Sequence, residues 1–252
     1  MSNSLNIAKF GGTSVATYQA MKNCARIVAG NQATRIVVVS AQAGVTNHLV
    51  SIAHTPLTSE QIKDTCQAII DIEMAVLNEI KDKASVADKL EDLFEELRGL
   101  ANHEEILHRD DLKDQLQSMG ERMSSLLFSA VLAEEGVDTL NFDVRKVLRT
   151  DSEFGEAAPQ VDVIGELSEQ LLRPEISNAI VVTQGFVGAN EEGKTTTLGR
   201  GGSDFTAALL AEALNADSCE IWTDVTGVYT TDPRIVPAAY PLPELSFEEA
   251  AE

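Results

Sequence analysis

Two short apolar runs near the N-terminus, separated by one amphipathic segment, limit most strongly what this chain can fold into. Residues 5–10 and 34–40 are typical of buried strands, and apolar residues at helical spacing predict a helix from about Tyr18 to Ala29. A strand, a helix and a second strand in this order predict a βαβ unit, whose two strands run parallel in one sheet. The beginning of the chain therefore indicates an α/β fold.

The same alternation returns in the second half of the chain. We expect strands at 137–142, 179–184 and 220–223, and helices near 161–172 and 205–214. This pattern predicts a mainly parallel central sheet sandwiched by helices, with ligands bound at the carboxyl ends of the strands.

An acidic, mostly helical stretch covers residues 59–135, where apolar residues such as Leu90, Phe94 and Leu97 recur at helical spacing. No linker rich in proline, glycine or serine divides this stretch from its neighbours. We therefore expect a single catalytic domain over residues 1–252, with a helical insertion or lid whose charges face solvent.

Composition excludes several classes of protein. The formal net charge of -21 and pI near 4.5 argue against a nucleic-acid partner, and no run of ~18 apolar residues predicts a membrane span. Cys24, Cys66 and Cys219 show no paired spacing, and the four histidines show no ligand pattern, so neither a disulfide nor a metal site is expected. With no targeting segment recognised, we expect a cytoplasmic location.

One apparent phosphate-binding motif is rejected. Residues 188–195 read GANEEGKT, which satisfies the phosphate-loop pattern G-x-x-x-x-G-K-[ST]. That loop must open a helix, whereas β-branched residues and glycines follow here, and Glu191 and Glu192 would place negative charge in an anion site. A solvent-exposed hairpin tip at Asn190 to Gly193 explains the segment better.

The segment KFGGTSV, residues 9–15, follows the first predicted strand. A lysine at the end of a buried strand, followed by two glycines, supplies a positive charge beside backbone N–H groups that an anion can approach. The alternative is an ordinary strand-to-helix turn with an exposed lysine. Lysine is rarely buried without a partner, so Lys9 favours a functional site.

A second segment, GRGGSD at residues 199–204, precedes a predicted helix. Glycines followed by Ser203 or Asp204 as N-cap would create an anion site, to which Arg200 adds a guanidinium suited to a carboxylate. By itself this could be a flexible loop with an ordinary cap. Together with Lys9, it predicts a site that contacts a transferring phosphoryl group from two sides.

A third segment, TDVTGVYTTDPR, spans residues 223–234 and follows the last predicted strand. Tyr229 could contact a nucleotide base and Arg234 its phosphates or ribose, although the segment could equally be structural. Glu121 stands at a predicted helix start, where a negative charge is favourable in any protein.

These motifs resemble those of a known enzyme family. KFGGTSV resembles the opening motif of aspartokinases, and RGGSD with TDVTGVYTTDPR is similar to the substrate and nucleotide motifs of the amino-acid-kinase family. Essentially all 252 residues resemble the kinase domain of monofunctional, lysine-sensitive aspartokinases. The third motif is shared widely across the family, so KFGGTSV is the motif that points specifically to aspartokinases.

The resemblance implies ATP-dependent phosphorylation of the side-chain carboxylate of L-aspartate to 4-phospho-L-aspartate, the first step of lysine, threonine and methionine biosynthesis. It implies ATP and Mg²⁺ as cofactors and a homodimer. Lys9 would stabilise the phosphoryl group and Asp204 would organise the lysine and magnesium, while Glu121 would bind the α-ammonium of aspartate and Arg200 its α-carboxylate. Further substrate contacts are implied for Ser40, Thr46, Gly201, Gly202 and Ser203, and ATP contacts for Lys9, Gly11, Gly12, Ser14, Thr223, Asp224, Tyr229 and Arg234.

Two alternatives stay open. A sister kinase acting on glutamate, acetylglutamate or UMP would share the fold and the third motif, and a coupled ADP-release assay across these acceptors separates them. A non-catalytic module would bind aspartate without turnover, so that aspartate would raise its melting temperature without ADP release.

The resemblance also predicts reduced activity. The chain stops at Glu252, before the segment that completes the family's nucleotide site with another lysine and before two regulatory ACT domains. We therefore expect a truncated kinase with weak or no activity. Isothermal titration with ATP and Mg²⁺ checks this expectation, and an affinity typical of a complete kinase would contradict it.

Overall fold

The computed structural model describes residues 4–224, 227–246 and 248–249. Its strands are β1 (Asn6–Phe10), β2 (Thr34–Val39), β3 (Thr139–Phe142), β4 (Ile180–Gln184), β5 (Val187–Ala189), β6 (Thr195–Thr197) and β7 (Ser218–Trp222). Its α-helices are α1 (Tyr18–Gly30), α2 (Val45–His54), α3 (Ser59–Leu77), α4 (Ala84–Ala101), α5 (Asp110–Gln117), α6 (Met119–Ala133), α7 (Val161–Leu167), α8 (Arg173–Ile176) and α9 (Gly202–Ala213). Two short helical segments join them, the 3₁₀ helix η1 (Val144–Lys146) and the π-helical η2 (Ser168–Leu172).

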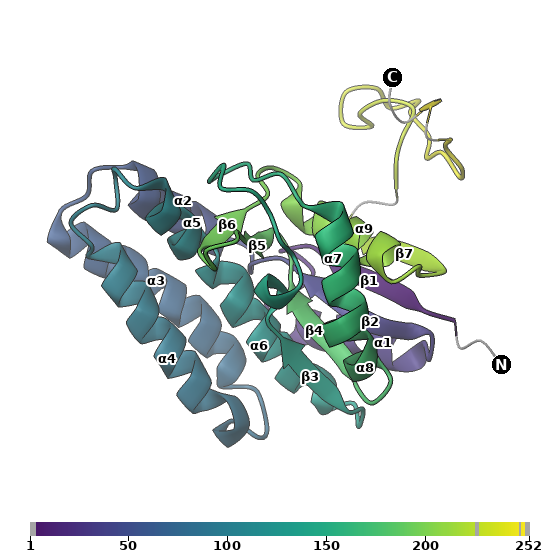
Figure 1. Cartoon of the computed structure of the whole chain (residues 1–252), viewed down its shortest axis with the longest axis horizontal. Coiled ribbons are helices and arrows are strands. Elements are labelled where there is room, and N and C mark those ends of the chain that lie inside the picture. Colours follow the sequence, from purple (N-terminus) through teal and green to yellow (C-terminus); the bar gives the residue numbers. More distant parts are fainter. Residues whose placement is uncertain (1–3, 225–226, 247, 250–252) are drawn as a thin grey trace. The chain divides into compact units, whose positions relative to one another are not determined.

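A five-stranded sheet in the order β3-β4-β2-β1-β7 forms the centre of the chain (Figure 1). All four neighbouring pairs run parallel. β1 therefore lies between β2, which follows it closely in sequence, and β7, which is formed more than 200 residues later. The prediction of a mainly parallel sheet between helices is confirmed.

The two faces of the sheet bury different sets of side chains. On β1, Ala8 and Phe10 belong to a core shared with α1, α2, α3, α4 and α6, whereas Ile7 belongs to a second core with α7 and α9. This division follows from the strand period of two, which sends successive side chains to opposite faces. Lys9 has the same parity as Ile7, so its side chain leaves the strand on the α9 face.

The helical stretch predicted at 59–135 consists of α3 to α6 and is layered on the sheet. α6 packs directly on β2, β3 and β4, and α5 contacts β6. The stretch is therefore part of the layer that covers the sheet. Its apolar stripes explain this, because Leu126, Leu127 and Val131 on α6 are buried against the sheet side of the core.

The segment that matches a phosphate loop forms a hairpin. β5 and β6 pair antiparallel on either side of it, so the lysine of GKT directly precedes strand β6 and opens no helix. Glu191, Glu192 and Gly193 are exposed as predicted. Asn190 is not: it is buried, donates from Nδ2 to Ser152 Oγ at 2.9 Å and accepts the Lys194 N–H at 2.9 Å, since its amide closes the turn.

Residues 223–252 form a second unit, separate from residues 1–222. Within it, the backbone N–H of Thr230 donates to the carbonyl of Tyr240 at 3.1 Å, and that of Leu242 donates to Val228 at 2.7 Å. Val225 and Thr226 of the third motif lie outside the described residues. None of the helices in the described ranges is both long and apolar enough to cross a membrane.

One carboxyl group inside the helical layer is unusual. Glu73 on α3 is fully buried, and neither of its carboxylate oxygens has a hydrogen-bond partner among the described residues. Burial, and secondly the charge of Glu121, raises the pKa of Glu73 well above its ordinary value. Burial in the folded chain therefore favours the neutral form of this side chain.

We predict that Glu73→Met stabilises the fold at alkaline pH. A group with a raised folded-state pKa contributes stability that is present below its unfolded pKa and lost as pH rises toward the folded one. The free energy of unfolding should therefore increase by roughly 1–3 kcal/mol at pH 8, with a smaller gain at pH 5. Urea denaturation at both pH values measures it, with the exposed Asp64→Asn on the same helix as control. An equal effect at both pH values would contradict the assignment.

Candidate functional site

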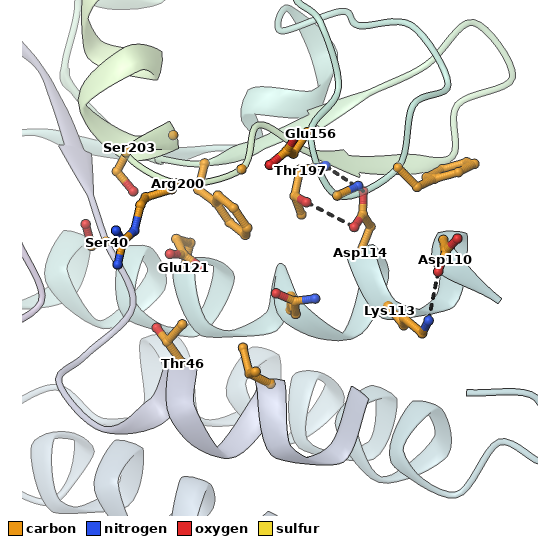
Figure 2. A pocket seen from close by; sticks show the side chains of 18 of the residues that line it. Ser40, Thr46, Asp110, Lys113, Asp114, Glu121, Glu156, Thr197, Arg200 and Ser203 are labelled. Atoms are coloured by element: carbon orange, nitrogen blue, oxygen red, sulfur yellow. Dashed lines mark hydrogen bonds and ion pairs between the residues drawn. The ribbon is translucent and has the colours of Figure 1, made fainter. Parts of the chain in front are cut away.

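Most of the predicted site residues of the first unit gather around one cavity at the carboxyl ends of the parallel strands. The cavity has a volume of about 1170 Å³ and lies between the start of α9, helix α2, the first turn of α6, helix α5 and residues 153–156 (Figure 2). Of the residues predicted from the sequence, it is lined by Lys9, Ser40, Thr46, Glu121, Arg200, Gly201, Gly202, Ser203 and Asp204.

Lys9 lies near the end of β1 and is only 8% exposed. Its Nζ forms an ion pair with Asp204 Oδ1 at 2.6 Å. A buried ammonium needs such a partner, because desolvation of an unpaired charge costs several kcal/mol. The Asp204 carboxylate is half exposed and faces the cavity, so the pair fixes the lysine without removing it from the site.

The glycine-arginine turn differs in one respect from the prediction. Neither Ser203 nor Asp204 is the N-cap of α9: the N-cap is Gly201, in the left-handed conformation with φ of 76°, and no side chain caps the helix. A left-handed residue here favours glycine. Asp204 is instead directed to Lys9, and the positive end of the twelve-residue helix faces the cavity.

Arg200 extends from this turn toward Ser40, Glu121 and Ser203, as Figure 2 shows. The turn is held close to the end of β4. A Cβ on Gly185 would lie 2.5 Å from Cβ of Ser203, so only glycine allows this approach. The first turn of α9 is thereby brought against the same sheet edge from which Lys9 projects.

Glu121 supplies a negative group to the cavity wall. It lies in the first turn of α6, is 6% exposed, and accepts the backbone N–H of Ala41 at 3.1 Å. Burial raises the pKa of Glu121 to about 7, although the Ala41 N–H, its own backbone and the charge of Lys9 all act to lower it. A carboxylate in this position can bind an ammonium group, which would lower its pKa again.

Not every predicted residue lines this cavity. Gly11, Gly12 and Ser14 lie in the loop that follows β1. All three are among the described residues, and none of them lines the cavity. The Gly11 N–H donates to the carbonyl of Trp222 at 3.4 Å, and the Ser14 N–H donates to Gly11 at 3.0 Å. A Cβ on Gly12 would lie 2.7 Å from the carbonyl oxygen of Ala41, so this glycine permits close packing of the two loops.

The predicted nucleotide contacts Thr223, Asp224, Tyr229 and Arg234 all belong to the second unit. There, Arg234 forms an ion pair with Asp232 at 2.8 Å, and its backbone N–H donates to the same carboxylate at 2.8 Å. Both bonds hold Asp232 and Arg234 together within the loop.

The sequence did not point to the far side of the cavity. Its walls there include His54, Asp114, Phe154, Glu156 and Thr197. No motif marks them: Asp114 stands in the acidic run DDLKD, where nothing distinguishes it from the exposed Asp110. Its burial arises only from the way α5 packs against β6.

The cavity can therefore hold a ligand that carries several negative groups and one ammonium. Lys9, Arg200 and the start of α9 provide positive potential, and Glu121 provides one negative group. Within the described ranges, no cluster of three or more histidine, cysteine, aspartate or glutamate side chains has the arrangement of a metal site. A divalent cation would need further ligands from the bound molecule itself.

Comparisons with known proteins identify the family of the chain. Residues 4–252 match the family model described as "Amino acid kinase family". The chain is 46% identical over 246 residues to the lysine-sensitive aspartokinase 3 of Escherichia coli, and 35% identical over 243 residues to an aspartokinase of Chlamydia pneumoniae. These alignments cover 98% and 96% of this chain, and 55% and 52% of the two relatives.

Among solved structures, the chain is similar to the crystal structure of E. coli aspartokinase III in complex with aspartate and ADP. The TM-score is 0.93 at 46% identity, with 98% of this chain and 55% of that chain covered. The chain thus spans about half the length of the relatives it matches.

Proposed function

Because the chain belongs to the amino acid kinase family, we propose that it transfers the γ-phosphoryl group of ATP to the side-chain carboxylate of L-aspartate, giving 4-phospho-L-aspartate. The observation that carries the proposal is the convergence of Lys9 and the Arg200 turn on one cavity, joined by the 2.6 Å ion pair to Asp204. The E. coli aspartokinase III similar to this chain is described in complex with aspartate and ADP, which supports the same substrates here.

In this proposal, aspartate is oriented by its two α-substituents. Glu121 binds the α-ammonium, and Arg200 binds the α-carboxylate through its planar guanidinium. Ser40, Thr46 and Ser203 line the cavity around these two residues and supply hydroxyl groups (Figure 2). The side-chain carboxylate is then left to face Lys9 and the start of α9.

The reaction needs no general base. The aspartate side chain, with a pKa of ~3.9, is already an anion at neutral pH and can attack the γ-phosphorus directly. The barrier is the approach of two negatively charged reactants and the charge that develops on the phosphoryl oxygens. Lys9 and the backbone N–H groups at the start of α9 stabilise that charge, with Gly201, Gly202 and Ser203 at the point of approach.

Mg²⁺ would supply charge neutralisation between the phosphate oxygens when ATP is bound. Asp204 suits this cation, because its ion pair with Lys9 uses Oδ1 and its half-exposed carboxylate faces the cavity. For the nucleotide we propose Thr223, Asp224, Tyr229 and Arg234, with Gly11, Gly12 and Ser14 near the phosphates, all from the resemblance of their motifs. A homodimer, a cytoplasmic location and a place in lysine, threonine and methionine biosynthesis stay predictions.

The direct test is to trap the acyl phosphate with hydroxylamine after incubation with ATP, Mg²⁺ and L-aspartate. Slow formation of aspartyl hydroxamate with release of ADP is the expected result. Hydroxamate from glutamate or acetylglutamate, but none from aspartate, would assign a sister kinase. Binding of aspartate without any ADP release would assign a binding module.

We predict that Lys9→Ala lowers kcat by ~10² or more while the circular dichroism spectrum is unchanged, because the variant lacks one donor to the transition state. Lys194→Ala serves as control, since this exposed lysine of the rejected phosphate-loop motif pairs with Glu192 at 3.0 Å. Its kcat should equal that of the unaltered chain. A near-normal kcat for the Lys9 variant would remove Lys9 from the mechanism.

We also predict that aspartate binds more weakly below neutral pH. Only ionised Glu121 can pair with the ammonium group, and the pKa of about 7 leaves roughly a tenth of this group ionised at pH 6. The Kd for L-aspartate should therefore rise about tenfold from pH 8 to pH 6, as measured by calorimetric titration. Glu121→Gln should bind weakly at both pH values, and a pH-dependence that persists in this variant would assign the titration to another group.

A further inference from the structure

Asp114 ties three parts of the cavity wall together. It lies on α5 and is 1% exposed. Its Oδ2 accepts the backbone N–H groups of Gly155 at 2.9 Å and Thr197 at 2.8 Å, and its Oδ1 accepts the Thr197 hydroxyl at 3.0 Å (Figure 2). One side chain thus joins α5, the loop before α7 and the end of β6.

These two partners flank the turn that carries Arg200. Thr197 is the last residue of β6 and precedes Arg200 by three residues. On the other side, a Cβ on Gly199 would lie 3.1 Å from Cγ of Glu156 and 3.3 Å from the carbonyl oxygen of Gly155, so loop and turn are in contact. The Asp114 carboxylate therefore holds both the start of the turn and the surface on which it rests.

The turn is closed by a backbone hydrogen bond, in which the Gly202 N–H donates to the carbonyl of Gly199 at 3.1 Å. Gly199 and Gly201, on either side of Arg200, have φ of 74° and 76°. Arg200 is exposed and forms no ion pair with any residue that the structure describes. A guanidinium between two glycines loses much conformational freedom on binding, unless the backbone on both sides is already anchored.

We propose that Asp114 is a positioning residue for substrate binding, which anchors the turn so that Arg200 is held ready for the α-carboxylate of aspartate. The inference rests on the proposed function for the identity of the ligand. Asp114 itself makes no contact with the ligand in this role. Its effect passes through Thr197, Gly155 and the turn, and should be confined to groups that Arg200 binds.

Binding measurements on Asp114→Asn test the proposal. An asparagine keeps the shape but replaces one acceptor oxygen by an NH₂ group, which cannot accept the hydrogen bonds made to Oδ1 or to Oδ2. We expect the Kd for L-aspartate to rise about tenfold or more. The Kd for the α-amide of aspartate, which lacks the α-carboxylate, should be unchanged in an NMR titration that reports weak binding. Asp111→Asn, on the same helix, paired with Arg109 at 2.5 Å and outside the cavity lining, is the control and should bind both ligands normally.

A double-mutant cycle separates positioning from general stabilisation. If Asp114 acts through Arg200, Asp114→Asn should weaken aspartate binding no further in an Arg200→Ala background. Equal loss of both ligands in Asp114→Asn, or additive losses in the cycle, would overturn the proposal, as would normal aspartate binding by a folded Asp114→Asn.

A second variant keeps the proposal testable if Asp114→Asn does not fold. Thr197→Val removes only the hydroxyl donor and keeps the shape of the strand residue, so we expect a smaller loss for aspartate and none for the α-amide. Unchanged aspartate binding by this variant would overturn the proposal. If the unaltered chain itself does not bind aspartate, the proposed function fails instead, which is a distinct outcome.

Discussion

The site depends on one ion pair between residues that are far apart in sequence. Lys9 from the first strand and Asp204 from the first turn of α9 meet at 2.6 Å. The pair has two effects, because it compensates the burial of the ammonium and joins the opening motif to the glycine-arginine turn. Both residues of the pair line the cavity.

The pair also explains how a strongly acidic chain can hold an anionic ligand. The formal net charge of -21 would repel phosphate groups at long range, but screening limits that field to about 10 Å at ordinary ionic strength. Inside the cavity, the local sources dominate: Lys9, Arg200 and the start of α9 are positive. The carboxyl groups nearest to them are either paired, as Asp204 is, or titrate near neutrality, as Glu121 does.

The sequence predicted the fold well, and nine of the residues that it singled out line one cavity. Strand and helix periods located the sheet, and Lys9 was found because a lysine beside a buried strand and two glycines is unusual. Asp114 could not be found, since its neighbours in DDLKD have the same chemistry and only tertiary packing distinguishes it. The N-cap of α9 was assigned to Ser203 or Asp204 because propensity favours them, but the pairing with Lys9 directs Asp204 elsewhere and leaves Gly201 as the cap. Helix α2 was not predicted, because it is only ten residues long.

The pairing of β1 with both β2 and β7 has a consequence for how the chain folds as it is synthesised. β1 and β2 emerge early from the ribosome, but the other edge of β1 stays without its hydrogen-bonded neighbour until residues 218–222 have been translated. Long-range parallel pairing of this kind is slow, and an unpaired strand edge attracts other chains. The nascent polypeptide therefore has an aggregation-prone interval between the synthesis of β1 and that of β7, during which chaperones that cover strand edges would improve the yield of folded protein.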